Sequence, residues 1–337
     1  MEGRLEVTAD AIEMQCCVEI RPPGSMQGAV RPLALAAREK QGGAPVLLAA
    51  RRLLEAVGKG DVVVIATGFH VPGFLPAGET DGPPGAAALA HALSLGVGAI
   101  PLLLGETTTV EPIRAACRAM GLVDGDIDSL RGGDYRFALD SFPTDAAAEA
   151  RADELLEALR PKAIIVTEKP GLNAKGVAHR GGGKRIDSGR ARIEVLTARA
   201  REIGIPTIAI GDNGNEAGMG LIADAVRVHK PYGAQCLCPC QGGIAAVDEA
   251  DVTVVGSVSN WAAYGIAACL AVALGDERLL HDGETERRVI AECLRAGAVD
   301  GVTCTYRQMV DGIPARINGH VVDILRTIVA TAIGKGS

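Results

Sequence analysis

The stretch TIAIGDNGNEAGMG, residues 207–220, runs from an apolar segment into acidic and amide side chains separated by glycines. Its polar members include Asp212, Asn215 and Glu216, which close or follow a predicted strand at 207–212. Glycine permits positive φ and close backbone approach, so such a bend brings side chains together at little steric cost. Because ligands of open α/β sheets bind beyond the carboxyl ends of strands, this pattern predicts a ligand site.

Two other predicted strands also lead into carboxylates. Glu79 and Asp81 lie in the Gly- and Pro-rich loop after the strand at 62–68, and Glu168 ends the strand at 163–168. Like charges at short range raise one another's pKa. A cluster of these carboxylates therefore needs protons, cations or a metal ion.

Carboxylate and amide oxygens are hard ligands, which suit Mg²⁺ or Mn²⁺ better than zinc. The sequence predicts a divalent metal site, Mn²⁺ or Mg²⁺, whose ligands are Glu79, Asp81, Asp212, Asn215 and Glu216. Two alternatives stay open. The acids could be solvated loop residues, and Asp81 could cap the helix that follows it by accepting backbone N–H groups.

Basic and polar residues follow Glu168 and the predicted strand at 252–258. The loop TEKPGLNAKGVAHRGGGKR supplies several of them, and Ser259 or Asn260 could open a helix whose N-terminal amides face the same crevice. The predicted substrate-binding residues are Arg180, Lys184, Asn173, Ser259 and Asn260.

Neither glycine-rich loop matches a nucleotide-binding motif well. The glycines after Asn213 are spaced G-x-x-x-G-x-G, which fails the dinucleotide fingerprint. The segment HRGGGKR, residues 179–185, lacks Ser or Thr after Lys184 and does not directly follow a strand, so its match to a phosphate loop is weak. A basic loop that binds a substrate carboxylate and a plain solvated loop both stay open for it.

The segment CLCPC places Cys236, Cys238 and Cys240 on one face if it is extended. Zinc sites more often use C-x-x-C pairs with a second pair elsewhere, and the sequence has no second pair. We therefore predict core or edge thiols at these positions.

Composition limits the class of protein. The chain has 337 residues, of which 48% are hydrophobic and only 3% aromatic, and its net charge is -7. An acidic chain without a long Lys/Arg run argues against nucleic-acid and anionic-membrane partners. The acidic N-terminus differs from a signal peptide, and no apolar run reaches about 18 residues, so we expect a cytoplasmic protein.

Short β-rich runs alternate with longer Ala-rich amphipathic stretches, which predicts an α/β fold: three layers, with a mostly parallel open sheet, helices on both faces and extra C-terminal helices. The predicted strands are 62–68, 99–105, 136–141, 163–168, 207–212 and 252–258, and the predicted helices between them are 85–96, 108–121, 144–161, 189–204 and 260–275. We expect a single domain over 1–337, made of a helical N-terminal flank (1–57), a βα core (58–275) and C-terminal helices (276–337). A hairpin is expected around MVDGIPARI.

The loops TGFHVPGF, ETDGPPGAAALAHAL, TEKPGLNAKGVAH, GIPTIAIGDNGNEAGMG, GSVSNWAAYGIAA and AGAVDGVT together resemble the D-glutamate cyclase family. The resemblance is to its C-terminal cyclase-like domain, which also occurs alone in bacterial and archaeal proteins. It runs in order from about Leu53 to the end of the chain. The family usually has Gly where this chain has Asn213.

The resemblance implies conversion of D-glutamate to 5-oxo-D-proline with loss of water, in which the α-amine attacks the γ-carboxylate. A metal ion would polarise that carboxylate. We expect Glu168 to act as general base and Lys169 or His179 to protonate the departing oxygen. Two other functions stay open for the same crevice: metal-dependent hydrolysis of a phosphate ester or amide, and non-catalytic binding of a small acidic metabolite. The chain could also form a homo-oligomer.

Overall fold

The computed structural model describes residues 2–22, 28–127 and 136–335. Its centre is a seven-stranded sheet in the order β3-β4-β2-β1-β5-β8-β9, and the pairings between these strands are all parallel. The strands are β1 (Val62–Ala66), β2 (Ile100–Gly105), β3 (Val123–Asp124), β4 (Arg136–Ser141), β5 (Ala163–Thr167), β8 (Thr207–Gly211) and β9 (Val252–Val255). The six predicted strands are all present, and β3 is a two-residue strand too short to show a sequence pattern.

Both faces of the sheet are covered, as the near-continuous apolar strands predict. Successive side chains of a strand point to opposite faces. On β1, Val63 and Ile65 belong to one core cluster, whereas Val62 and Val64 belong to another. The predicted three-layer α/β architecture is therefore confirmed.

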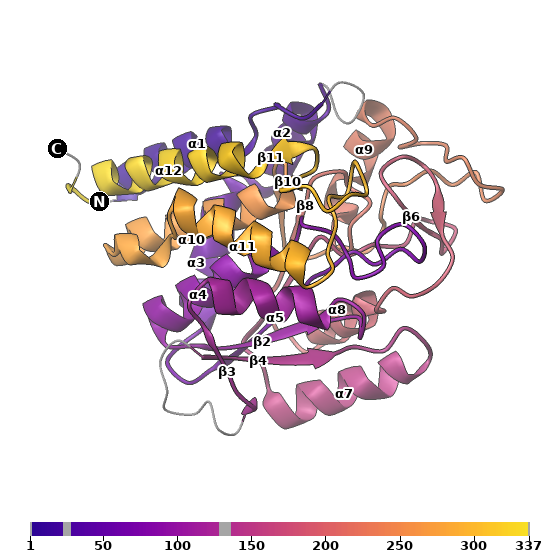
Figure 1. The fold of residues 1–337 in the computed structure, drawn as a ribbon, viewed down its shortest axis with the longest axis horizontal. Helices are drawn as coiled ribbons and strands as arrows, with labels where there is room; N and C mark the ends of the chain where they lie inside the picture. Colours follow the sequence, from indigo (N-terminus) through magenta and orange to yellow (C-terminus); the bar gives the residue numbers. More distant parts are fainter. Residues whose placement is uncertain (1, 23–27, 128–135, 336–337) are drawn as a thin grey trace.

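The larger core cluster lies between one face of the sheet and a broad layer of helices. The first and last helices of the chain, α1 and α12, belong to this layer and pack against each other and against α10. Figure 1 shows α1 and α12 lying alongside each other, with both chain termini at the same end. The helices that contribute to this cluster are α1 (Glu2–Cys16), α3 (Pro45–Ala56), α4 (Pro83–Val97), α5 (Val110–Ala119), α10 (Ser259–Leu274), α11 (Gly283–Arg295) and α12 (Ala315–Ala332).

The opposite face of the sheet is covered in two parts. In one part, α7 (Ala147–Leu159) and α8 (Ile193–Glu202) pack beside β1, β2 and β5. In the other, α2 (Val30–Gln41) and α9 (Ala223–His229) pack beside β8 and β9. The helices of the N-terminal flank therefore lie on both faces of the sheet, with α1 and α3 on one face and α2 on the other. Its break between α2 and α3 follows from the left-handed Gly42 at the end of α2 and from Pro45 at the first turn of α3.

The hairpin expected near the C-terminus is present as β10 (Met309–Val310) and β11 (Ile313–Pro314). Its turn residues, Asp311 and Gly312, have φ of 53° and 77°. An Asp-Gly pair is favoured where both central residues of a two-residue turn take positive φ. The turn brings Asp311 toward the carboxyl ends of the sheet strands, where it joins the cavity described below.

The starts of α4 and α10 are joined by two side chains that cap each other's helices. Asp81, which precedes α4, accepts the backbone N–H groups of Ser259 and Asn260 at the start of α10, at 2.9 and 2.8 Å. Asn260 in turn accepts the N–H groups of Gly82 and Gly85 at the start of α4, at 2.9 and 2.8 Å. Asp81 is therefore chiefly a cap of α10, and it also accepts the N–H of Gly82 before α4 at 3.0 Å.

We predict that Asn260→Ala lowers the free energy of unfolding by about 2–3 kcal/mol, because the buried Gly85 N–H loses this acceptor and the Thr80 carbonyl loses this donor. Urea denaturation measures the loss. Asp282→Ala, which removes the exposed cap of α11, is the matched control and should cost about 1 kcal/mol. An equal or smaller loss for Asn260→Ala would contradict the buried-cap account.

Candidate active site

The site lies where the chain reverses its direction across the sheet. From β1 the chain builds outward through β2 to β4 and β3, and from β5 it builds the other way through β8 to β9. β1 and β5 are neighbours, so a topological switch point lies between their carboxyl ends, where open α/β sheets bind ligands. A cavity of about 370 Å³ opens there.

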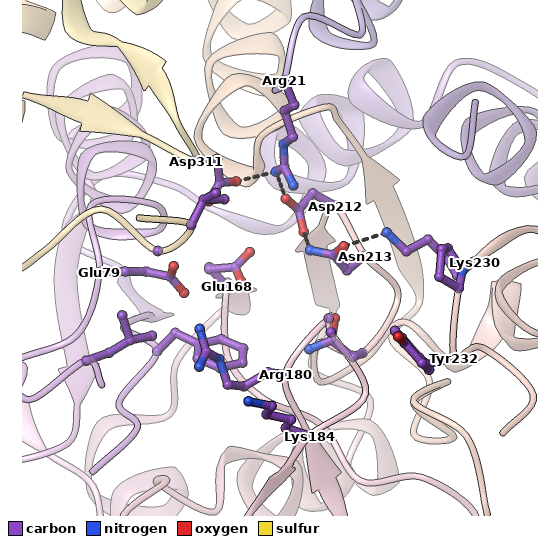
Figure 2. A pocket seen from close by; sticks show the side chains of 18 residues that line it. Arg21, Glu79, Glu168, Arg180, Lys184, Asp212, Asn213, Lys230, Tyr232 and Asp311 are labelled. Carbon is purple, nitrogen blue, oxygen red and sulfur yellow. Dashed lines mark hydrogen bonds and ion pairs between the residues drawn. The ribbon is translucent and has the colours of Figure 1, made fainter. Parts of the chain in front are cut away.

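The cavity has an acidic side and a basic side. In Figure 2, Glu79, Glu168 and Asp311 gather on one side, and Arg180 and Lys184 lie on the other. Arg21 contacts Asp212 and Asp311 beside the acids, so the cavity offers groups of both signs to a small charged ligand.

The carboxylates form two groups of three that share Asp212. One group joins Asp212 to Asp81 and Asp311, and the other joins it to Glu168 and Glu216. Within each group, one oxygen of every carboxylate lies within 4.8 Å of the others. Acids from distant strand ends therefore converge, as the sequence predicts.

Glu168 has an unusual backbone. Its φ is 48°, in the left-handed region that non-glycine residues rarely adopt. Such a conformation costs about 1–3 kcal/mol and persists only where the surroundings enforce it. The Ser259 hydroxyl donates to Glu168, and a Cβ at Gly82 would lie only 3.0 Å from the Cβ of Glu168. The end of β5 and the starts of α4 and α10 together hold the Glu168 carboxylate at the cavity.

Two buried cations partly compensate the acids. Arg21, whose side chain is 6% exposed, contacts both Asp212 and Asp311. The ammonium of Lys230 donates to Asn213 Oδ1 at 2.6 Å, and Asn213 Nδ2 donates to Asp212. Figure 2 shows this chain from Lys230 through Asn213 to Asp212 and on to Arg21. Burial, followed by repulsion from Arg21, lowers the pKa of Lys230 to about 8.

Burial dominates the proton affinity of the acids. It raises the pKa of Glu79 and Glu168 well above the ordinary range, and Asp311 adds to the effect on Glu79 as Glu216 does on Glu168. Burial and then Asp311 raise the pKa of Asp81 to about 8. These carboxyl groups retain protons at pH values where ordinary acids have lost them.

Six of the predicted site residues line the cavity, and two others lie directly behind its acidic side. The lining residues are Glu79, Glu168, Arg180, Lys184, Asp212 and Asn215. The two behind it are Asp81 and Glu216, which complete the carboxylate groups.

The structure places Lys169 away from the cavity. Its ammonium is fully buried, donates to the Gly68 carbonyl at 2.7 Å and forms an ion pair with Glu106. Glu106 also accepts the Ala191 N–H at 2.7 Å. Lys169 therefore ties the ends of β1 and β2 together, and its expected role as proton donor lacks access to a ligand.

Asn173 and His179 also have structural partners. The Asn173 amide donates to the Gly243 carbonyl at 2.7 Å, and its oxygen accepts the N–H groups of Lys175 and Val177. His179 turns its Nε2 toward the thiol of Cys238, 3.3 Å away. Both residues shape the loop that carries Arg180 and Lys184.

The start of α10 differs from its expected role as a carboxylate-binding site. The amides of Ser259 and Asn260 already bind Asp81, so an internal carboxylate occupies the position expected for the substrate. Ser259 acts through its hydroxyl on Glu168 instead.

Five cavity residues with polar side chains were not foreseen from the sequence: Arg21, Asn213, Lys230, Tyr232 and Asp311. Asp311 follows a recognisable hairpin signal, and Asn213 stands beside Asp212 in the glycine-rich loop. Arg21 has no local pattern that points to a site, because it reaches the cavity from the segment that follows α1.

The donor set fits a divalent metal ion. Carboxylate oxygens are the ligands that Mg²⁺ and Mn²⁺ prefer, and the group around Asp212, Glu168 and Glu216 supplies three of them. Asn215, which lines the same cavity, has a buried Oδ1 without a hydrogen-bond partner among the described residues, although its Nδ2 donates to the His179 carbonyl at 2.9 Å. An acceptor of this kind in a cavity lined by carboxylates is available to a cation.

The fold and cavity define an α/β protein with an acidic binding site at the switch point of a parallel sheet. The family model described as "D-glutamate cyclase-like, C-terminal" matches residues 19–326, so the chain belongs to this family. The human protein "D-glutamate cyclase, mitochondrial" is 29% identical over 218 residues. That match covers 62% of this chain but only 32% of the human protein.

Among solved structures, a serine palmitoyltransferase variant from S. paucimobilis with a bound PLP–myriocin aldimine is 12% identical, with a TM-score of 0.23. The alignment covers 98% of this chain and 84% of that chain. A likeness this weak carries no argument. Within the described residues, the helices are all too short or too polar to cross a membrane.

We predict that the melting temperature of the protein without added divalent metal falls as pH rises from about 4 to about 8. Over this window the folded Asp81, with a pKa of about 8, holds a proton that the unfolded chain has released, its ordinary pKa being 3.8. Glu79 and Glu168 act in the same direction.

Differential scanning calorimetry across this pH range measures the slope. Glu168→Gln should flatten it, since one of the buried carboxyl groups no longer titrates. A melting temperature that rises steadily toward pH 8 in the wild type would contradict the raised pKa values.

Proposed function

We propose that the chain is a D-glutamate cyclase-like enzyme that converts D-glutamate to 5-oxo-D-proline and water with a bound Mn²⁺ or Mg²⁺ ion. The carrying observation is the pair of buried carboxylate groups that share Asp212 and face a basic wall across a small cavity. Membership of the family, and the name of its human relative, supply the reaction.

The size and charge of the cavity suit an amino acid with two carboxylates. Its volume of about 370 Å³ is at the lower end of the range of about 300–1,000 Å³ for ligand pockets. Arg180 and Lys184 would hold the α-carboxylate. The γ-carboxylate would then lie toward the acidic side, next to the metal ion.

Glu168, Asp212 and Glu216 would hold the ion, together with Asn215 Oδ1. The other group suits an ion less well, because Asp81 already accepts three backbone N–H groups, whereas Glu216 accepts two. When bound, the ion would act as a Lewis acid that makes the γ-carboxyl carbon more electrophilic. Glu168 is then a ligand rather than the general base expected from the sequence.

The remaining cavity residues would move the protons. The α-nitrogen must lose two protons as its bond to the γ-carbon forms, and one γ-oxygen must gain two protons to leave as water. Glu79, a buried carboxyl group that belongs to neither group of three, would act in its ionised form, accepting one proton from nitrogen and passing it to the departing oxygen. Lys230, with a pKa of about 8, would donate the second proton to that oxygen and be recharged by the second proton from nitrogen.

We predict that Glu79→Gln lowers kcat by about 100-fold or more while the Kd for Mn²⁺ is unchanged, because it removes a proton acceptor but no ligand. Asp212→Asn and Glu216→Gln should instead weaken Mn²⁺ binding. Isothermal titration gives the affinity, and chromatography of 5-oxo-D-proline gives the rate. Asp153→Asn removes an exposed carboxylate and is the control expected to match the wild type.

Four results would overturn this assignment. Unchanged turnover in Glu79→Gln would remove its role, and unchanged Mn²⁺ affinity in Glu168→Gln would return Glu168 to the role of base. Product from a phosphate ester but none from D-glutamate would favour a hydrolase. Substrate-dependent melting shifts without any product would favour a binding module.

We further predict an alkaline limb near pH 8 in the profile of kcat/KM. Lys230 is protonated below its pKa of about 8 and can donate only in that form, so activity should fall above it. Lys230→Met should lose about 100-fold in kcat together with this limb. A variant that keeps the same limb would show that another group titrates there.

A further inference from the structure

The three cysteines of CLCPC meet His179 in one compact cluster outside the cavity. The Sγ atoms lie 3.5 Å apart for Cys236 and Cys238, 3.3 Å for Cys236 and Cys240, and 3.3 Å for Cys238 and Cys240. His179 Nε2 lies 3.3 Å from Cys238 Sγ and 3.7 Å from Cys240 Sγ. All four atoms are thus mutually close, although His179 comes from a separate part of the chain.

We infer that these four side chains bind a single structural zinc ion that anchors the basic wall of the cavity. Three cysteines and one histidine are an established ligand set of structural zinc sites. This inference does not depend on the proposed reaction.

The spacing of the ligand atoms is close to that of a closed tetrahedral site. With Zn–S near 2.3 Å and Zn–N near 2.0–2.1 Å, a regular tetrahedron places its sulfurs about 3.8 Å from one another and about 3.5 Å from the nitrogen. Five of the six separations are 3.3–3.7 Å and all lie within 4.8 Å, so small shifts of these side chains would complete the tetrahedron. Four protein ligands leave no open position for substrate, so the site is structural.

The surroundings prepare the ligands for a metal ion. His179 Nδ1 lies 3.1 Å from the Val177 carbonyl, which can only accept, so Nδ1 carries the proton and Nε2 presents its lone pair to the sulfurs. Cys240 Sγ receives the Gly242 N–H at 3.5 Å and the Asn173 amide at 3.6 Å. Donors that point at sulfur stabilise the thiolate form that binds zinc.

The ion would fix the hairpin that carries the basic residues. His179 belongs to β6 (Ala178–His179), which pairs with β7 (Arg185–Ile186), and Arg180 and Lys184 lie in the turn between them. The Leu237 N–H donates to the Gly183 carbonyl in this turn at 3.0 Å. Zinc would therefore join the hairpin to the cysteine segment. Asn173, near this hairpin in sequence, would act as a supporting residue through Cys240.

The zinc content of protein purified without chelators tests the inference. Mass spectrometry of the metal should find about one Zn²⁺ per chain in the wild type and a large loss in Cys238→Ser and Cys240→Ser. Cys17→Ser changes a cysteine outside the proposed ligand set and should keep the zinc, as should Asp212→Asn. Equal zinc in the wild type and the cysteine variants would overturn the site.

A second measurement covers variants that fail to fold. Cobalt exchanged into the wild type should give the intense thiolate absorption of a tetrahedral Co²⁺ site, unchanged in Asp212→Asn. Absence of that band would overturn the inference, as would a disulfide among Cys236, Cys238 and Cys240 found in the native protein by peptide mapping. Hydrogen exchange at residues 180–184 should quicken when zinc is removed, and unchanged exchange would overturn the anchoring role.

Discussion

Burial of several carboxylates behind one small cavity is the constraint on which the site depends. A buried carboxylate needs hydrogen-bond donors, a cation or a proton. The protein uses all three. Backbone amides at the start of α10 bind Asp81, Arg21 contacts Asp212 and Asp311, and burial raises the pKa of Glu79 and Glu168. A metal ion at Asp212 would extend the same compensation and give it a chemical use.

Close backbone packing explains why glycines border these acids. A Cβ at Gly301 would lie 1.6 Å from Glu79 Oε2, and one at Gly211 would lie 2.5 Å from Glu216 Oε2. Neither position has room for a larger residue while the carboxylate keeps its place. The glycine-rich loop after β8 thus serves close approach as well as turning, and its amides at Asn213 and Gly214 hold Glu216.

The sheet and the acidic edge of the site were predictable, because strand patterns and the rule for carboxyl ends are local signals. Asp81, Glu168 and Glu216 follow from that rule. Arg21 does not, since its position depends on how α1 packs against α10 and α12. The roles of Lys169 and Asn260 were also beyond the sequence, because a buried lysine or a cross-helix cap looks the same in sequence as a ligand-binding residue.

The cysteine cluster is a second case in which the sequence alone does not show which side chains lie together. The C-x-C-x-C spacing lacks the usual pair pattern, and its fourth member, His179, is brought to it only by the β6–β7 hairpin. Sequence spacing therefore favoured thiols without a ligand. The structure does place Cys236 in a core cluster with Cys238 and Cys240 packed against it, and the proposed zinc site rests on the geometry that the fold adds.

Anomalous diffraction from crystals soaked in Mn²⁺ tests the central claim most directly. The account predicts a manganese peak bound by Asp212, Glu168 and Glu216, with Asn215 Oδ1 turned toward it. The same data with no manganese at these carboxylates, and with Arg21 alone compensating Asp212 and Asp311, would contradict it.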